Sequence, residues 1–158
     1  MSDAIERKLR EDVEKHGWHV LNVLSKGGTS PGWSYSVGLF HTFGHPEIVV
    51  VGLPPDTGHA IINDVGAAIR AGRRLEDGMV DAGFLEGYDS LFRQVPASRY
   101  ESHFGRAIDF YGGTDFPVLQ LVYPDREGRW PWEEGVAAGF REAQPVLALE
   151  PGAGAAAT

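Results

Sequence analysis

Two histidines and a glutamate, His41, His45 and Glu47, lie close together in the sequence. Imidazole nitrogens and carboxylate oxygens together suit zinc or iron, so the cluster raises the hypothesis of a metal site. The i, i+4 spacing brings two histidines to one ion only on a helix, and Gly44 and Pro46 predict a loop instead. We therefore assign these three residues to ligand binding without metal and keep a His/Glu metal site as an alternative. A structural hydrogen-bonding role for His45 and Glu47, at the entry to a strand, also stays open.

Further polar and aromatic residues complete the predicted ligand site: Tyr35, Ser36, Gln120 and Trp132. Residues 33–39 alternate bulky and small side chains, which predicts a packed face with Tyr35 and an opposite face, with Ser36, that leaves room. Gln120 interrupts an apolar run, so its amide needs partners, either in a structural network or in a ligand. Trp132 and Trp130 flank Pro131, and paired indoles either line a pocket for a planar ligand or cover the edge of a core.

Several catalytic signatures are incomplete or absent. Ser34 and Ser36 each have one glycine of a nucleophile elbow and a serine in place of the other, so a serine hydrolase is disfavoured. The glycine-rich stretch 27–32 matches neither a phosphate loop nor a dinucleotide fingerprint, and we interpret it as a hairpin loop. The chain has no cysteine, which excludes disulfides, zinc fingers, iron–sulfur clusters and thiol nucleophiles.

The charge of the chain bears on its partners. With 14 Lys and Arg against 22 Asp and Glu, the net charge is −8, so we expect no nucleic-acid partner. An acidic surface can instead steer a basic protein, which keeps open a protein-interaction, accessory or immunity-type module. No apolar run is long enough to span a membrane and the first residues do not form a secretory signal, so we expect a cytoplasmic protein without a membrane partner. The oligomeric state is not predicted.

The pattern of apolar residues predicts an α+β domain. We expect helices over 3–16, from 56 or 57 to 70, and over 100–111, and strands over 18–25, 33–39, 47–53 and 116–123, with short strands near 74–76 and 91–95. A loop is expected over 40–46. This order predicts a single domain over 2–149 with a largely antiparallel sheet and three or so flanking helices. Residues 150–158, rich in Gly and Ala, are expected to form a disordered tail.

Several separated motifs resemble one family. The segments 33–39, 44–48, 116–125 and 130–132, the run that ends at Pro54, and the pair Gln144-Pro145 together resemble the bacterial family catalogued as domain of unknown function 4262. The resemblance covers residues 16–147. It implies no activity and no catalytic residue, so the residues still favour small-molecule or cofactor binding, and whether the protein is an enzyme is left open.

A weaker similarity, of fold alone, is to flavin-binding split barrels of the flavin-reductase type. The resemblance implies a sheet that is split-barrel-like and a flavin near the 41–47 loop, with room supplied by Ser34, Ser36 and Gly38. The flavin phosphate would then meet backbone donors or the arginines at 70, 73 and 74.

Overall fold

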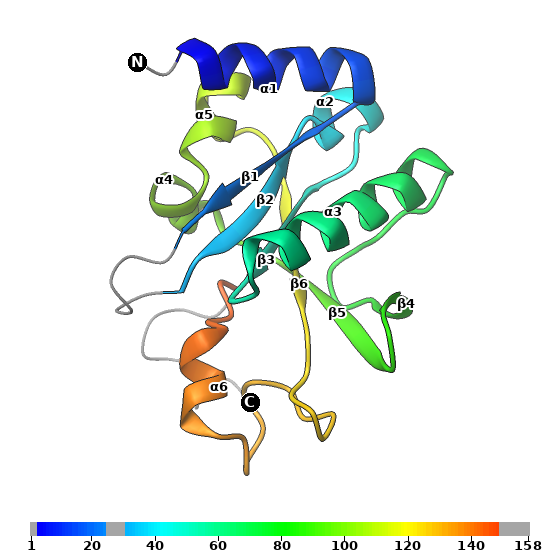
Figure 1. Cartoon of the computed structure of the whole chain (residues 1–158), viewed down its shortest axis with the longest axis vertical. Coiled ribbons are helices and arrows are strands. Elements are labelled where there is room, and N and C mark those ends of the chain that lie inside the picture. The colour runs from blue at the N-terminus through cyan, green and yellow to red at the C-terminus, as the bar shows by residue number, and fades with distance from the viewer. Residues whose placement is uncertain (1–2, 25–30, 149–158) are drawn as a thin grey trace.

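A six-stranded sheet runs through the middle of the molecule (Figure 1). The computed structural model describes residues 3–24 and 31–148. Within them the sheet has the order β1-β2-β3-β6-β5-β4. All neighbouring strands are antiparallel except β3 and β6, which are parallel. The strands are β1 (His19–Val23), β2 (Trp33–Val37), β3 (Glu47–Val51), β4 (Val80–Leu85), β5 (Tyr88–Gln94) and β6 (Val118–Val122).

Helices cover both faces of this sheet (Figure 1). The first face packs against α1, α4 and α5, with a core that includes Val13, Val49 and Phe104. The second packs against α3, with a core that includes Ile48 and Ile62. The helices are α1 (Asp3–His16), α2 (Leu39–Phe43), α3 (Pro55–Arg70), α4 (Tyr100–His103), α5 (Gly105–Tyr111) and α6 (Ala138–Ala143), with a 3₁₀ turn at Ala97–Arg99. The fold is therefore α+β, as predicted, with a largely antiparallel sheet in one domain.

The sheet is open in the part of the chain that the structure describes. β1 and β4 are its two edges and do not pair with each other. The closed form implied by the split-barrel similarity is thus not formed. Among the same residues, no helix combines the length and the apolar character that crossing a membrane requires. The predicted tail over 150–158 and most of the predicted loop over 27–32 lie outside the described residues.

The loop predicted over residues 40–46 is wrong, because α2 occupies most of it. Gly38 (φ 118°) and Gly44 (φ 66°) adopt left-handed conformations at the two ends of this helix. Gly44 therefore ends a helix rather than preventing one, and its N–H bonds the carbonyl of Phe40.

Two other element predictions need correction. Residues 74–76 form no strand, and the backbone N–H of Leu75 bonds a histidine side chain instead of a neighbouring strand. The helix predicted over 100–111 is two helices, α4 and α5, separated at Phe104 by a non-helical backbone (φ −128°, ψ 43°). α6 was not predicted, since its six residues carry too few apolar positions to show a period.

The expected room beside the small residues of β2 is absent. Ser34 and Ser36 are 2% and 0% exposed. Helix α3 lies directly on Ser34, since a Cβ placed on Gly58 would lie 2.6 Å from the Ser34 Oγ, and the Ser36 hydroxyl donates to the buried Glu47 carboxylate. The small side chains therefore allow a close approach of helix to sheet, and the space is filled by protein.

Candidate functional site

The carboxylate of Glu47 is fully buried at the start of β3. Its two oxygens accept hydrogen bonds from the Ser36 hydroxyl (2.7 Å), from three backbone N–H groups at Gly38 (2.9 Å), Leu39 (3.2 Å) and Phe40 (3.2 Å), and from the Tyr111 hydroxyl. Burial raises the pKa of this carboxyl, and the donors oppose that rise. The protein thus uses the acceptor capacity of Glu47 to hold β2, β3, α2 and α5 together.

Both ring nitrogens of His45 are hydrogen-bonded to protein groups. Its side chain is fully buried. Its Nε2 accepts the backbone N–H of Leu75 at 2.9 Å, so the proton of a neutral ring lies on Nδ1, which is 2.9 Å from the carbonyl oxygen of Pro46. Burial lowers the pKa of His45, and the charge of Arg74 acts in the same direction.

A pH dependence of stability follows from the lowered pKa of His45. In the unfolded chain the His45 ring becomes protonated near the ordinary pKa of 6.5, whereas in the folded protein it becomes protonated only at lower pH. Because the unfolded state then binds more protons, the free energy of unfolding falls as the pH drops below about 6.5. We expect His45→Gln to lose less stability than wild type between pH 7.5 and 5.5 in urea unfolding. His41→Gln, which changes an exposed ring, serves as the control and keeps the wild-type dependence. An NMR titration in which the His45 ring protonates at 6.5 or above would contradict this account.

The three residues of the metal hypothesis are not arranged as a metal site. His41 is exposed on α2, and its ring packs edge-on against Phe110 at a centroid distance of 5.6 Å. Across residues 3–24 and 31–148, no three or more His, Cys, Asp or Glu side chains form a group that could hold a metal ion. Glu47 and His45 instead direct their polar atoms at protein donors and acceptors.

Gln120 and Trp132, the other two predicted site residues, contact neither His45 nor Glu47 through any hydrogen bond or ring contact among the described residues. The Gln120 Nε2 donates to the carbonyl of Pro145 (3.0 Å), and its Oε1 accepts the N–H of Leu147 (2.7 Å). These two bonds form a structural network, which is one of the two interpretations of Gln120 given above. They connect residues 145–147 to β6. Trp132 lies in the loop between β6 and α6, stacked on Trp130 with ring centroids 5.9 Å apart.

Tyr35 lines a cleft of about 670 Å³ between the end of the β1–β2 hairpin and the helices α4 and α5. We call it the Trp33–Arg106 cleft. The Trp33 Nε1 donates to the carbonyl of His103 (2.8 Å), and the two rings lie 4.6 Å apart. The Tyr35 hydroxyl accepts the backbone N–H of Arg106 (3.2 Å). The lining residues are Val23, Leu24, Trp33, Tyr35, Glu101, Ser102, His103, Gly105, Arg106, Ile108 and Asp109.

The polar groups of this cleft are mixed in charge. The half-buried Arg106 forms no ion pair within the described residues, while Glu101 and Asp109 are exposed along the same cleft. Burial lowers the pKa of His103, which favours its neutral form at pH 7. Burial also raises the pKa of Tyr35 to about 12, so its hydroxyl keeps a proton to donate. Arg106 is therefore the cation of the cleft, and Tyr35 supplies a neutral donor beside it.

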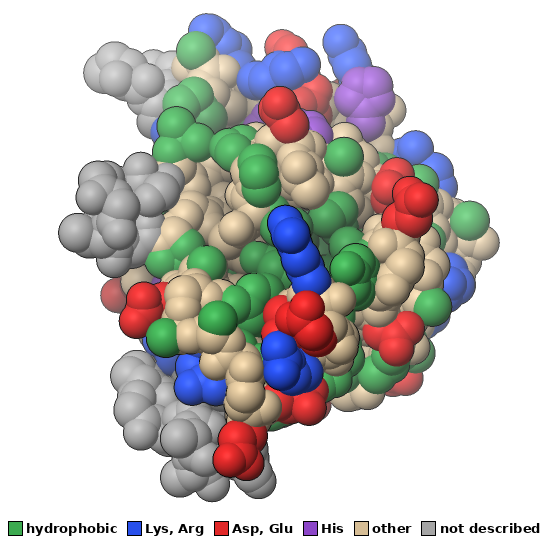
Figure 2. Space-filling view, turned by 60° about the horizontal axis from the view of Figure 1, so that its bottom comes forward, with side chains coloured by type: hydrophobic (Ala, Val, Ile, Leu, Met, Phe, Trp, Pro, Cys, Tyr) green, Lys and Arg blue, Asp and Glu red, His purple; other side chains and the backbone are tan. Residues whose placement is uncertain are grey.

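A second cavity, of about 800 Å³, adjoins this cleft. Both are lined by Val23, Leu24 and Trp33, and Leu24 is 65% exposed. The second cavity continues past Pro54, at the start of α3, to Ala143 in α6. Figure 2 views the molecule from the side nearer α6 and shows hydrophobic side chains across the middle of that face, interspersed with charged side chains. Apolar surface thus extends from the cleft toward α6.

His103 and Arg106 were not predicted as site residues. Helical spacing was visible over 100–111, and residues three apart share one face of a helix, but no residue pattern showed that this face lines a cleft with Trp33 and Tyr35. The helices α4 and α5, separated at Phe104, carry His103 and Arg106 along this cleft. Nothing in the residue pattern marks that break except Gly105 after it.

The residues proposed for a flavin do not fit one. Ser34 is covered by α3, and Ser36 is buried with its hydroxyl bonded to Glu47. The three arginines expected at the phosphate already bind protein: Arg70 donates to the carbonyl of His16, Arg73 pairs with Asp81, and Arg74 donates to the carbonyls of Phe43 (3.2 Å) and Gly44 (3.1 Å). The structure thus offers neither the space nor the free donors at the place the similarity implies.

Comparison with known proteins gives one match. A family model described as Domain of unknown function (DUF4262) matches residues 12–137, well over half of the chain. No curated protein and no solved structure matches the chain.

Proposed function

The chain belongs to the family described as Domain of unknown function (DUF4262), and since that description names no activity, we propose from geometry that the protein binds a small organic acid in the Trp33–Arg106 cleft. The observation that carries this proposal is Arg106, a half-buried residue that lines a cleft of ligand size and forms no ion pair among the described residues. A carboxylate is the group that a guanidinium binds with two parallel hydrogen bonds.

The other lining residues support a ligand with an apolar body and a single acidic group. The rings of Trp33 and His103 supply a surface for aromatic or aliphatic carbon, which continues into the adjoining cavity beyond Trp33. The Tyr35 hydroxyl can donate to the ligand. Glu101 and Asp109 repel a polyanion, so chains of phosphate groups fit poorly, whereas hydroxyl or amino groups of the ligand can meet these carboxylates.

The proposal is tested with 8-anilinonaphthalene-1-sulfonate, a fluorescent probe that joins aromatic rings to one anionic group. We expect saturable binding of one probe molecule, weakened at least about tenfold by Arg106→Gln, because a charge-assisted hydrogen bond contributes about 1.5–3 kcal/mol. Arg7→Gln removes an exposed arginine of α1 and serves as the matched control with unchanged affinity. Near-UV circular dichroism confirms that each variant is folded.

Equal affinity of wild type and Arg106→Gln would refute the anion site, and binding of many probe molecules without saturation would refute a specific cleft. If the probe binds as expected, displacement of its fluorescence by a panel of aromatic and aliphatic carboxylates then ranks the natural ligand class.

A further inference from the structure

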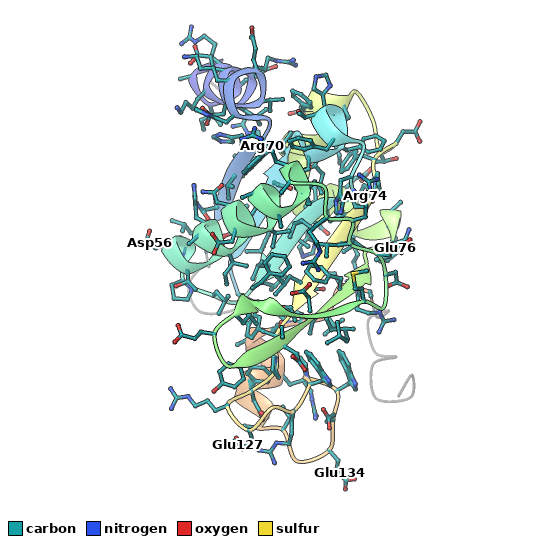
Figure 3. The ribbon with its side chains drawn as sticks, turned by 90° about the vertical axis from the view of Figure 1, so that its right-hand side faces the viewer. Asp56, Arg70, Arg74, Glu76, Glu127 and Glu134 are labelled. Carbon is teal, nitrogen blue, oxygen red and sulfur yellow. The ribbon has the colours of Figure 1, made fainter. Side chains whose placement is uncertain are left out.

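A third cavity lies near the β4 edge of the sheet, far from β1, between the β4–β5 turn and the loop that follows β6. Its volume is about 450 Å³, and it is lined by Ala82, Gly87, Tyr88, Asp89, Pro124, Gly128 and Trp130. We call it the Tyr88–Trp130 hollow. Figure 3 shows the β4–β5 hairpin next to the loop that carries Glu127 and Glu134. The hollow shares no lining residue with the Trp33–Arg106 cleft, so it is a separate feature.

Two aromatic rings form walls of this hollow. Tyr88 is 39% exposed, and its hydroxyl is 3.4 Å from the carbonyl of Arg126, a contact that joins the hairpin to the loop. Trp130 is half-buried and stacks on Trp132 with only 12° between the ring planes. The backbone N–H of Trp130 donates to the Glu133 Oε2 at 2.7 Å. These contacts hold the Trp130 indole in one orientation without covering the hollow.

The charge of the hollow is negative. Asp89 lines the hollow, is exposed and forms no ion pair within residues 3–24 and 31–148. The nearby Arg129 guanidinium is already bound to Asp125 (3.1 Å) and Glu127 (3.1 Å). Within the described chain, arginines lie over the rings of Trp18, Phe43, Phe84 and Phe110, and none lies over Tyr88 or Trp130. The hollow thus combines aromatic walls with a carboxylate and holds no cation of its own.

We propose that the Tyr88–Trp130 hollow binds a small organic cation that carries a quaternary ammonium group. The negative face of an aromatic ring attracts such a cation, and two rings with a carboxylate beside them form the kind of site that recognises choline-like groups. A quaternary ammonium holds its water weakly compared with a metal ion, so it can enter a partly apolar hollow. The net charge of −8 raises the local concentration of cations at the surface.

The probe for this proposal is choline, followed in a ¹⁵N–¹H spectrum of the full chain. The chain has four tryptophans, so four indole N–H signals are expected, and Trp130→Phe identifies the signal of Trp130. Choline is expected to shift the Trp130 signal in a saturable manner. In the Trp130 variants, which lack this signal, choline binding is followed on the backbone N–H signals of Gly87 and Gly128, which also line the hollow. Trp130→Leu and Asp89→Asn should each weaken choline binding at least about fivefold, whereas Trp130→Phe keeps an aromatic face and retains most of the affinity. The matched control is Asp56→Asn, an exposed carboxylate on α3, which leaves the affinity unchanged.

A neutral isostere separates charge recognition from apolar contact. In 3,3-dimethyl-1-butanol a tert-butyl group replaces the trimethylammonium of choline, and we expect it to bind at least about fivefold more weakly. Equal binding of the two compounds, or unchanged affinity in Asp89→Asn, would overturn the proposal. A saturable shift with glucose and none with choline would overturn it in favour of a sugar site. Cosedimentation with phosphatidylcholine vesicles would identify a lipid headgroup as the source of the cation, and binding of choline alone a free molecule.

Discussion

Glu47→Ala is expected to lower the free energy of unfolding by about 4 kcal/mol, a large share of the roughly 5–15 kcal/mol that holds a domain of this size folded. The substitution leaves the hydroxyls of Ser36 and Tyr111 and the three N–H groups that open α2 without their acceptor. The site is fully buried, so water cannot replace the carboxylate without opening the structure. Urea unfolding at pH 7, followed by far-UV circular dichroism, measures the loss.

Two further variants separate the contribution of the Tyr111 hydroxyl to stability from that of the Glu47 carboxylate. Tyr111→Phe removes one donor and keeps the carboxylate, so we expect a loss of about 1–2 kcal/mol. Glu47→Gln keeps the shape but turns an NH₂ group toward N–H donors, and its stability should lie between those of Tyr111→Phe and Glu47→Ala. The account fails if Glu47→Ala is as stable as Tyr111→Phe, because the backbone donors of α2 would then not depend on the carboxylate.

A second large loss of stability is expected on substitution of Gly52, which follows β3 in the turn toward α3. Its φ is +90°, and an added Cβ would lie 2.1 Å from the carbonyl oxygen of Ala143 and 2.8 Å from the Tyr123 hydroxyl. Gly52→Ala therefore combines an unfavourable backbone conformation with a backbone clash, and we expect a loss of about 3 kcal/mol or more. Because Ala143 ends α6, the substitution should also displace α6 from the cavity that it helps to line.

Gly112→Ala is the matched control for Gly52→Ala. Gly112 also has a positive φ, +73°, but no heavy atom lies within 4 Å of an added Cβ. Its substitution tests backbone conformation alone and should cost about 1–2 kcal/mol by the same unfolding measurement. Equal losses for the two variants would show that the contact between Gly52 and Ala143 contributes nothing.

Most of the fold could be predicted because its central elements have strong local signals. The apolar run at 48–51 is buried on both faces, and it forms β3 between two other strands. The spacing of Ile62, Val65 and Ile69 predicted α3, whose buried residues lie at those positions. The loop prediction over 40–46 was wrong for a different reason: Gly44 and Pro46 were interpreted as residues that prevent a helix, although a glycine with positive φ is also the residue that ends one.

The candidate site was less predictable, since its contacts join residues far apart in the chain. The sequence shows that Glu47 opens an apolar strand and so needs a partner, but that partner includes Tyr111, which lies in α5. Tyr35 and Arg106 line the same cleft because α5 packs against β2, a long-range contact that the sequence does not show. Whether Ser34 faces space or a helix depends on the close approach of Gly58, which no local pattern reports.

The single parallel pairing in the sheet has a consequence for how the chain folds during synthesis. β3 pairs with β2 soon after both leave the ribosome, but its other neighbour, β6, pairs residue 47 with residue 118. Until residues 118–122 emerge, β3 presents an unpaired edge rich in valine and isoleucine, which is the kind of edge that associates with other chains. The closure of this long loop is also slow, because distant pairings must overcome the entropy of the intervening chain before they are stabilised. Aggregation during expression should therefore compete with folding most strongly for chains truncated before β6.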